Sequence, residues 1–237
     1  MKKGLNISEH FYSLQGEGKT MGIPSVFLRL QSCNLMCDEK WTCDTIEVWI
    51  KGNHYSIEET LDMFKENNYT ERLKQGAHLI ITGGEPLLQQ HNIVEFLKQY
   101  KERFSYLPYI EIETNCTQYA GDELCKYVDL FNVSPKLSSA GMNIKRRYKP
   151  QAIERFNEIE NSIFKFVIAN KDDWEELKSM YIDSMNIKTE KIWLMPAADD
   201  QDMLRENSEY VSKLCINHCY NYSSRLQIEL WNQTTGV

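Results

Sequence analysis

The chain contains the stretch Val26-Phe27-Leu28-Arg29-Leu30-Gln31-Ser32-Cys33-Asn34-Leu35-Met36-Cys37-Asp38-Glu39-Lys40-Trp41-Thr42-Cys43-Asp44-Thr45. Its apolar start predicts a short buried strand over residues 26–31, and the three cysteines Cys33, Cys37 and Cys43 follow within eleven residues. Iron–sulfur clusters and structural zinc sites normally have four protein ligands. Three thiolates therefore favour a four-iron cluster whose fourth iron is open for chemistry. A zinc site that borrows a distant ligand, or three unpaired thiols, are the alternatives.

A second strand-like run ends abruptly at a pair of glycines. It reads Leu79-Ile80-Ile81-Thr82-Gly83-Gly84-Glu85-Pro86. Glycines at this point allow the backbone to approach a ligand closely and to take positive φ, and Pro86 prevents the strand from continuing. An ordinary strand-to-loop turn would also explain a lone Gly-Gly pair. The pair therefore indicates a cofactor site only in combination with the cysteines.

Strand-like and helix-like segments alternate along the chain. Strands are predicted at 26–31, 78–82, 109–113, 130–134, 163–168, 191–195 and 226–230, and helices at 56–66, 92–103, 152–161, 172–183 and 210–219. The run Ser56-Ile57-Glu58-Glu59 has a capping-box pattern at the start of its helix. Such alternation predicts βαβ units and a parallel sheet. We expect one α/β domain over residues 1–237, a partial, open (β/α) barrel with its site at the C-terminal ends of the strands.

Length and composition fit a small enzyme. The 237 residues can build one sizeable core, and the formal net charge of −7 argues against broad nucleic-acid binding. No apolar run approaches the length of a membrane span, and Met1-Lys2-Lys3-Gly4 does not open a secretory signal. An odd count of seven cysteines favours a reducing cytoplasm over a disulfide framework.

Four cysteines lie outside the triplet. Cys215 and Cys219 are four residues apart on a predicted helix, so both thiols could share one face and hold a second metal. A third ligand is not evident, and buried unpaired thiols are the simpler interpretation. Cys125 falls in the apolar phase of a short helix. The histidines at 10, 54, 78 and 91 have no partners at metal-ligand spacing.

Several further motifs occur in a fixed order. They are Phe11-Tyr12-Ser13-Leu14-Gln15-Gly16-Glu17-Gly18, Gly22-Ile23-Pro24, Ile112-Glu113-Thr114-Asn115, Val133-Ser134-Pro135-Lys136, Phe164-Lys165-Phe166-Val167, Leu194-Met195-Pro196 and Arg225-Leu226-Gln227-Ile228-Glu229-Leu230-Trp231. With the cysteine triplet and the Gly-Gly-Glu-Pro segment, this set resembles the 7-carboxy-7-deazaguanine synthase family, within the radical S-adenosylmethionine (SAM) superfamily. The resemblance runs from about residue 10 to the last residue.

The chain departs from the family pattern at two places. The gap between the second and third cysteines is five residues, Asp38 to Thr42, where radical SAM proteins usually have two. We expect Asp38-Glu39-Lys40 to form an outward turn and Trp41 and Thr42 to return beside the cluster. Cys116 follows Glu-Thr-Asn, where the family usually has Gly. A positive φ would strain Cys116, so the turn is expected to differ locally.

The resemblance implies a radical reaction. The cluster and SAM would generate a 5′-deoxyadenosyl radical after one-electron reduction, so no side chain is the catalytic group. This radical would take a hydrogen from 6-carboxy-5,6,7,8-tetrahydropterin, whose ring would contract with loss of ammonia to 7-carboxy-7-deazaguanine, in the 7-deazapurine (queuosine) pathway. SAM would be regenerated. Mg²⁺ is implied as a further cofactor.

The resemblance also implies roles for individual residues. Cys33, Cys37 and Cys43 would bind the [4Fe-4S] cluster, and Thr45 would bind Mg²⁺ through its hydroxyl. The residues implied for SAM are Thr42, Cys43, Asp44, Gly84, Glu113, Ser134, Pro135, Lys136 and Lys165. Those implied for the substrate are Leu14, Gln15, Gly16, Glu17, Arg29, Thr82 and Val237.

Arg29 is also singled out by its position. It lies two residues after Phe27 on the predicted strand, so the two side chains share a face that would point into the barrel. There a guanidinium suits the substrate carboxylate. Each role has a plainer alternative: Arg29 as a salt-bridge partner, Thr45 as a helix cap and Lys136 as a solvated charge.

Two other functions remain open from the sequence. A radical SAM activase would install a glycyl radical on a partner protein, and a zinc-stabilised binding module would not be an enzyme. The Gln15-Gly16-Glu17-Gly18 loop and the 226–231 tail favour the synthase, with both segments closing the site. The resemblance further implies a homodimer and an electron donor such as flavodoxin or ferredoxin, with no nucleic-acid or membrane partner.

Overall fold

The computed structural model describes residues 3–37 and 50–234. In this part of the chain nine strands form one sheet in the order β3-β1-β2-β4-β5-β6-β7-β8-β9. The strands are β1 (Leu5–Leu14), β2 (Pro24–Leu30), β3 (Asn53–Tyr55), β4 (His78–Gly83), β5 (Ile110–Thr114), β6 (Leu130–Val133), β7 (Ser162–Ile168), β8 (Ile192–Pro196) and β9 (Asn221–Tyr222). From β2 to β9 all pairs are parallel, whereas β1 pairs antiparallel with both β2 and β3.

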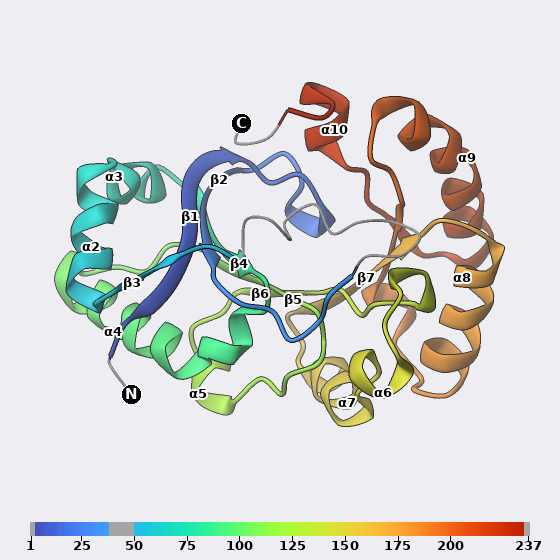
Figure 1. Ribbon diagram of the computed structural model, residues 1–237, viewed down its shortest axis with the longest axis horizontal. Helices are drawn as coiled ribbons and strands as arrows, with labels where there is room; N and C mark the ends of the chain where they lie inside the picture. Colours follow the sequence, from blue (N-terminus) through green and yellow to red (C-terminus); the bar gives the residue numbers. More distant parts are fainter. Residues whose placement is uncertain (1–2, 38–49, 235–237) are drawn as a thin grey trace.

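The helices lie along the outside of a curved, open sheet (Figure 1). They are α2 (Ile57–Glu66), α3 (Tyr69–Lys74), α4 (Gln90–Phe104), α5 (Asp122–Cys125), α6 (Ile144–Arg147), α7 (Pro150–Glu158), α8 (Lys171–Glu176), α9 (Gln201–His218) and α10 (Leu226–Trp231). A π-helical segment, Leu177–Asp183, extends α8. The predicted open (β/α) barrel is therefore confirmed. None of the described helices is long and apolar enough to cross a membrane.

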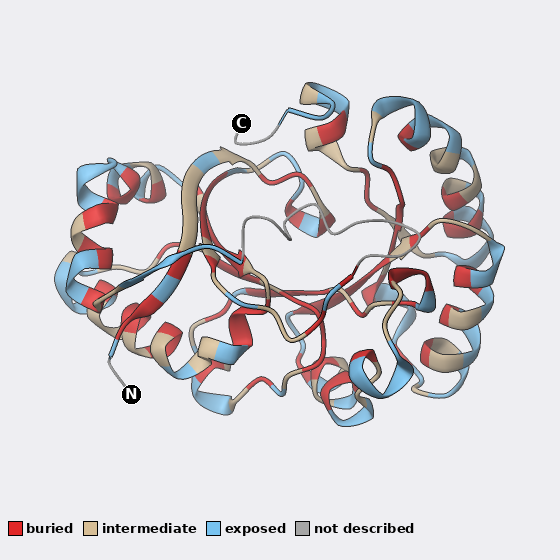
Figure 2. Ribbon diagram, viewed as in Figure 1, coloured by how far each residue is buried: buried red, intermediate tan, exposed pale blue. Residues whose placement is uncertain are grey.

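Alternation along each strand separates an apolar outer face from an inner face. Val26, Leu28 and Leu30 of β2 belong to one large buried cluster together with helix residues such as Phe64 and Phe96. Figure 2 shows these strands as a nearly continuous buried layer between the helices. The alternating positions face the inside and carry the polar residues Arg29, Thr82, Glu111, Glu113, Asn132 and Lys165. This polar inner wall is the frame of the candidate site.

The predicted capping box is confirmed at the start of α2. The Ser56 hydroxyl accepts a hydrogen bond from Glu59 N at 3.2 Å, and the Glu59 carboxylate accepts one from Ser56 N at 2.7 Å. These reciprocal bonds satisfy backbone N–H groups that have no partner inside the helix. The helix packs Phe64 into the outer cluster and so supports the back of the site's first strands.

The predicted strand at 226–230 is wrong, because this segment is helix α10. Leu226, Ile228 and Leu230 alternate as in a strand, but a run this short does not distinguish the two structures. The N–H groups of Ile228 and Glu229 both donate to Arg225 O. Ile228 is buried against the start of α9, whereas Leu230 is exposed. The sequence reading also missed strand β1.

Candidate active site

The strand ends bring the sequence motifs to one edge of the sheet. Gly84 N donates to Leu30 O at 3.2 Å and Glu85 N to Ser32 O at 2.9 Å, which joins the end of β4 to the cysteine segment after β2. Ser134 N donates to Thr114 O at 2.7 Å, which joins the ends of β5 and β6. Cys33 and Cys37, the Gly-Gly pair and the Ser-Pro-Lys segment therefore lie at the C-terminal edge of neighbouring strands, as predicted.

Close backbone contact explains the glycine pair. Gly83 has φ +141°, and a Cβ added there would lie 2.2 Å from Leu30 O. A Cβ on Gly84 would lie 2.2 Å from Ser32 O and 2.7 Å from Cys33 Cβ. Any side chain at these positions would push the cysteine segment away from β4. The pair is therefore more than an ordinary strand-to-loop turn.

Glu85 ties the ends of β4 and β5 together from a fully buried position. Its carboxyl group accepts hydrogen bonds from Thr114 Oγ1 at 2.8 Å, Asn115 N at 2.7 Å and Leu87 N at 3.0 Å. Burial raises the pKa of Glu85 to about 7, against the effect of these hydrogen bonds. The sequence alone indicates Glu85 only as part of the Gly-Gly-Glu-Pro segment.

Two of the three predicted cluster ligands lie in the described residues. Cys33 is half-buried and Cys37 buried, and both pack with Leu35 and Ala140. Cys33 Sγ accepts hydrogen bonds from Leu35 N at 3.4 Å and from Asn115 Nδ2 at 3.7 Å. An apolar enclosure with N–H groups directed at sulfur fits an iron–sulfur site.

Several other predictions, near this segment and at the C-terminal residue, lie outside the described residues. They concern Cys43, Thr42, Asp44, Thr45, Val237 and the expected turn at Asp38-Glu39-Lys40 with the return of Trp41.

A carboxylate pair dominates the polar inner wall. Gln15 Nε2 donates to Glu111 Oε1 at 3.2 Å and to Glu113 Oε1 at 3.0 Å. Thr82 Oγ1 donates to Glu113 Oε2 at 2.7 Å, and Asn132 Nδ2 donates to Glu111 Oε1 at 3.1 Å. Burial raises the pKa of Glu111 to about 7, and the Glu113 charge acts in the same direction. The structure thus brings together the predicted Gln15, Thr82 and Glu113.

Glu111 and Asn132 were missed by the sequence reading. The available signal was the alternation of Glu111 with Glu113 on a strand whose other residues are apolar, because alternate residues share a face.

Glu17 connects the N-terminal loop to the C-terminal helix. Its half-buried carboxylate forms ion pairs with Lys165 and, at 3.2 Å, with Arg225, and it accepts a hydrogen bond from Gln227 Nε2 at 2.8 Å. Burial alone would raise the pKa of Glu17, but the two cations hold it below its ordinary value. The sequence alone indicates Arg225 and Gln227 only as members of the tail motif.

The loop and the helix also meet through their backbones. Leu226 N donates to Gly16 O at 2.9 Å, and Gly18 N donates to Ser223 Oγ at 2.7 Å. A Cβ on Gly16 would lie 2.0 Å from Gln227 Oε1. Leu14 ends β1 just before this loop.

Arg29 shares the face of Phe27, as predicted from its position. In register with it on β4 is Thr82. Arg29 Nε forms an ion pair with Glu9 Oε1 at 2.7 Å, and the guanidinium carbon lies 5.8 Å from the centre of the Phe11 ring. The structure therefore contains the salt bridge of the plainer alternative, while the predicted substrate contact stays a prediction.

The remaining predicted residues follow β6. Ser134 and Lys136 are half-buried and Pro135 is buried. Lys136 Nζ donates to Ser134 Oγ at 3.3 Å. These residues therefore border the site edge, where Ser134 N donates to Thr114 O.

Comparison with known proteins decides the family. Residues 14–155 match the family described as a 4Fe-4S single cluster domain. A 7-carboxy-7-deazaguanine synthase of Halobacterium salinarum is 31% identical, over 96% of this chain and 91% of that protein. One from Pyrobaculum aerophilum is also 31% identical, over 98% and 97%. The chain belongs to the 7-carboxy-7-deazaguanine synthase family.

A solved structure agrees with this family. The crystal structure of QueE from Escherichia coli matches with a TM-score of 0.69 and 26% identity, covering 93% of each chain. The comparisons confirm the predicted radical SAM synthase as against the glycyl-radical activase, and they support a [4Fe-4S] cluster as against zinc.

Cys116 has a left-handed backbone conformation at the position where the family pattern usually has Gly. It has φ +66° and is almost fully buried after β5, and its N–H donates to Thr114 Oγ1 at 3.3 Å. Cys116 therefore has the positive φ that strains any residue other than glycine, and whether the turn differs from that of the family stays a prediction.

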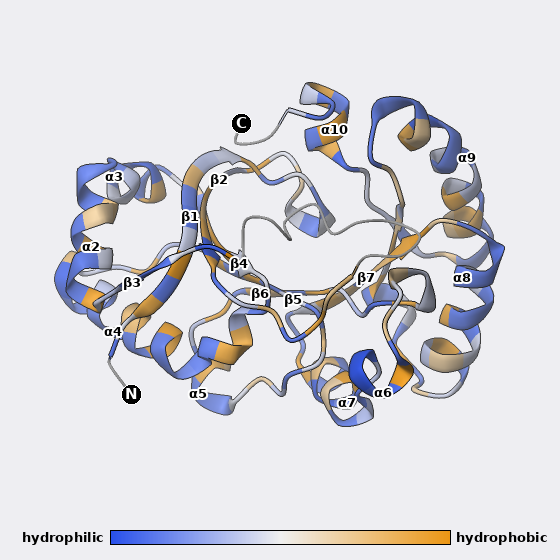
Figure 3. Cartoon of the chain, in the orientation of Figure 1, coloured by the Kyte–Doolittle hydropathy of each residue, from blue (hydrophilic) through white to orange (hydrophobic). Residues whose placement is uncertain are grey.

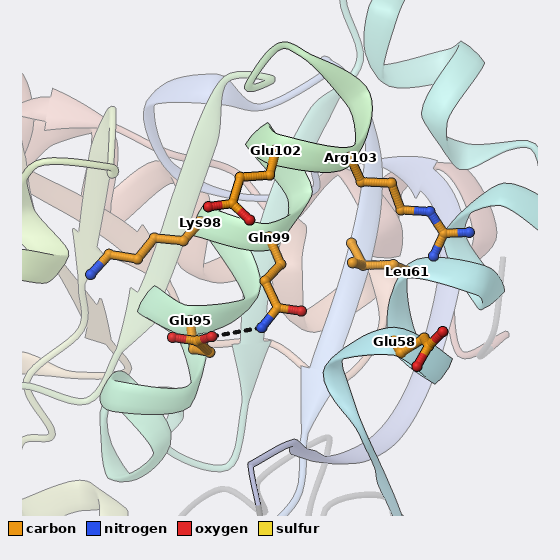
Figure 4. Close-up of a pocket in the computed structure, with 7 residues that line it drawn as sticks. All are labelled: Glu58, Leu61, Glu95, Lys98, Gln99, Glu102 and Arg103. Atoms are coloured by element: carbon orange, nitrogen blue, oxygen red, sulfur yellow. Dashed lines mark hydrogen bonds between the residues drawn. The ribbon is translucent and has the colours of Figure 1, made fainter.

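No second metal site is found in the described residues. Cys215 is buried in the outer cluster, and Cys219 is exposed at the end of α9. A surface hollow between α2 and α4 is lined by Glu58, Leu61, Glu95, Lys98, Gln99, Glu102 and Arg103 (Figure 4). These helices cover the outer face of the sheet, so the hollow is separate from the site.

Proposed function

We propose that this chain converts 6-carboxy-5,6,7,8-tetrahydropterin to 7-carboxy-7-deazaguanine with loss of ammonia. The observation that carries this proposal is the joining of two features on one sheet: a cysteine segment held against Gly83 and Gly84, and a buried polar wall inside the barrel. Family membership supports the same reaction.

The residues at the strand ends fit the two cofactors. When bound, the [4Fe-4S] cluster and SAM supply the radical that abstracts hydrogen. We propose that Cys33, Cys37 and Cys43 hold the cluster. SAM would be held by Gly84, Glu113, Ser134, Pro135, Lys136 and Lys165 together with the 42–44 segment. The absence of a side chain at Gly84, where a Cβ would meet Ser32 O at 2.2 Å, lets this backbone pack against the segment that carries Cys33, where we propose the cluster and SAM bind.

The inner wall and the N-terminal loop would bind the pterin. The Gln15 amide nitrogen donates hydrogen bonds to Glu111 and Glu113, and its amide oxygen accepts a hydrogen bond from Glu17 N at 3.3 Å. We therefore assign Gln15 and Glu17 to holding the loop in shape as much as to direct contact. Leu14, Gly16, Thr82 and Val237 complete the proposed substrate set.

Arg29 would bind the substrate carboxylate. Its ion pair with Glu9 uses Nε, and we propose that the two terminal guanidinium nitrogens make the substrate contact in the paired geometry that guanidinium favours.

Further features follow the family resemblance. We propose that Thr45 binds Mg²⁺, that a one-electron donor such as flavodoxin or ferredoxin reduces the cluster, and that the protein is a cytoplasmic homodimer. The chain would work as one domain, with the N-terminal loop and the C-terminal tail closing the site. The ion pairs and hydrogen bonds of Glu17 with Lys165, Arg225 and Gln227 support this closure.

The test is an anaerobic reaction of the reconstituted protein. Protein, SAM, Mg²⁺, chemical reductant and 6-carboxytetrahydropterin are combined, and the product is identified by mass. Formation of 7-carboxy-7-deazaguanine that depends on both SAM and substrate is expected. SAM cleavage without that product would contradict the assigned substrate, and a colourless protein that binds zinc would contradict the cluster.

A further inference from the structure

One short segment covers the cysteine segment from the outside. It follows β6 and contains the turn Ser138–Ala140 and helix α6. Ala140 and Met142 pack with Leu35 and Cys37. Arg146 Nη2 donates to Asn34 O at 3.4 Å. Within the described residues, helix α6 therefore lies beside the segment that carries Cys33 and Cys37.

The stretch that includes this segment has a net charge opposite in sign to that of the whole chain. Residues 130–153 contain five cations, Lys136, Lys145, Arg146, Arg147 and Lys149, and no Asp or Glu, whereas the chain carries a formal net charge of −7. Figure 3 shows α6 as one of the most hydrophilic helices of the fold.

The charges of α6 divide into one buried and several surface cations. Arg147 is buried and forms an ion pair with Glu176 at 2.5 Å, so it has a structural role. Lys145 and Arg146 are exposed and Lys149 is half-buried. No carboxylate in residues 3–37 and 50–234 forms an ion pair with these three side chains.

Exposed apolar side chains accompany these cations. Met36, between two proposed cluster ligands, is 55% exposed, and Ile144 at the start of α6 is 46% exposed. We call Met36, Ile144, Lys145, Arg146 and Lys149 the basic face. An apolar centre beside surface cations is typical of small, transient protein interfaces, where charge sets the encounter rate.

We propose that the basic face is the docking surface for an acidic one-electron carrier protein that reduces the cluster. This inference rests on the proposed function, because it needs a cluster at Cys33 and Cys37. In the step the carrier is oxidised by one electron and the cluster is reduced by one, with no bond formed or broken. An acidic partner is repelled by the chain's overall charge of −7, so a group of surface cations beside Cys33 and Cys37, with no ion pair to a carboxylate of residues 3–37 and 50–234, selects this face.

The test compares two sources of electrons. Product formation by the reconstituted holoenzyme is measured with flavodoxin and its reductase, and separately with dithionite. In the triple variant Lys145→Glu/Arg146→Glu/Lys149→Glu, we expect kcat/KM for flavodoxin to fall by about ten- to a hundredfold. The dithionite rate should stay within about twofold, because a small reductant needs no docking surface. The flavodoxin rate of the parent should also fall with rising salt.

A matched control reverses three cations elsewhere. Lys65 on α2, Lys101 on α4 and Arg205 on α9 are exposed, and Lys65→Glu/Lys101→Glu/Arg205→Glu makes the same change in net charge. This control should keep most of the flavodoxin rate. An equal loss in the control would overturn the proposal, because the effect would come from overall charge.

Further outcomes distinguish a damaged variant, a wrong docking surface and a wrong proposed function. If the triple variant also loses the dithionite rate, the double variant Lys145→Glu/Lys149→Glu, which retains the Arg146 contact with Asn34, must still lose flavodoxin-supported turnover selectively. Unchanged flavodoxin kinetics in that variant would overturn the proposal. A parent protein that forms no product with dithionite would instead contradict the proposed function.

Discussion

Glu111 should make the stability of this protein fall as the pH rises from about 5 to 7.5. Its carboxyl group is fully buried in the inner wall, and burial raises its pKa from 4.5 to about 7. Between these two values the folded state retains a proton that the unfolded state has lost, so folding is favoured at low pH and the contribution is lost as pH rises through this window. The difference corresponds to about 3 kcal/mol, at about 1.4 kcal/mol for each pH unit.

Two substitutions separate the charge from the hydrogen bonds. Glu111→Gln removes the titration but keeps an acceptor for Gln15 and Asn132, and the Thr20 hydroxyl can rotate to accept from the new amide. Its free energy of unfolding should exceed that of the parent above pH 7 and should vary less with pH, by about 3 kcal/mol. Glu111→Ala leaves Thr20 Oγ1 and Asn132 Nδ2 without their observed partner, at about 1–3 kcal/mol for each buried group.

The measurement is urea unfolding of the parent and both variants, without cofactors, at several pH values between 5 and 7.5. Glu85, whose pKa is also raised to about 7 by burial, contributes equally to all three proteins and cancels in the differences. Glu17 does not interfere, because its pKa is lowered and its stabilisation is complete above about pH 4.5. A Glu111→Gln variant with the same pH dependence as the parent would refute the reasoning.

Three further predictions concern the site. Replacing any of the three clustered cysteines with Ala should abolish the iron–sulfur absorbance and turnover, whereas Cys215→Ala and Cys219→Ala should keep both; loss of the cluster in either of the latter would contradict the assignment. Arg29→Lys should weaken pterin binding by about ten- to a hundredfold, since a charge-assisted pair contributes about 1.5–3 kcal/mol, while SAM cleavage without substrate survives; unchanged affinity or a lost cluster would show the role to be wrong. Cys116→Gly should be more stable to urea than Cys116→Ala by about 1 kcal/mol, because only Gly relieves the left-handed conformation, and the reverse order would disprove the strain.

The sequence predicted the strands that carry the motifs. Strands β2 and β4 to β8 were recognised because buried parallel strands are short, continuous apolar runs. Their C-terminal ends lie on one edge in any parallel sheet, so the adjacency of the cysteines and Gly84 followed from the sequence pattern. Ordered motifs also identified the family.

Only the tertiary structure showed which distant side chains meet. Gln15 bonds to Glu111 across 96 residues, and Gln227 bonds to Glu17 across 210. Neither pair leaves a local signal, because spacing along the chain specifies faces of an element and not the partners of those faces.

The segment 226–230 illustrates the same limit. Its alternating apolar residues suit either a strand or a helix, and local pattern does not choose between them. Packing of Ile228 against α9 and the bonds of the tail to the Gly16–Glu17 loop accompany the helix. The sequence by itself therefore determined the barrel and its motif-bearing edge, while tertiary contacts decided the closure of the site, because closure depends on surfaces that meet only after folding.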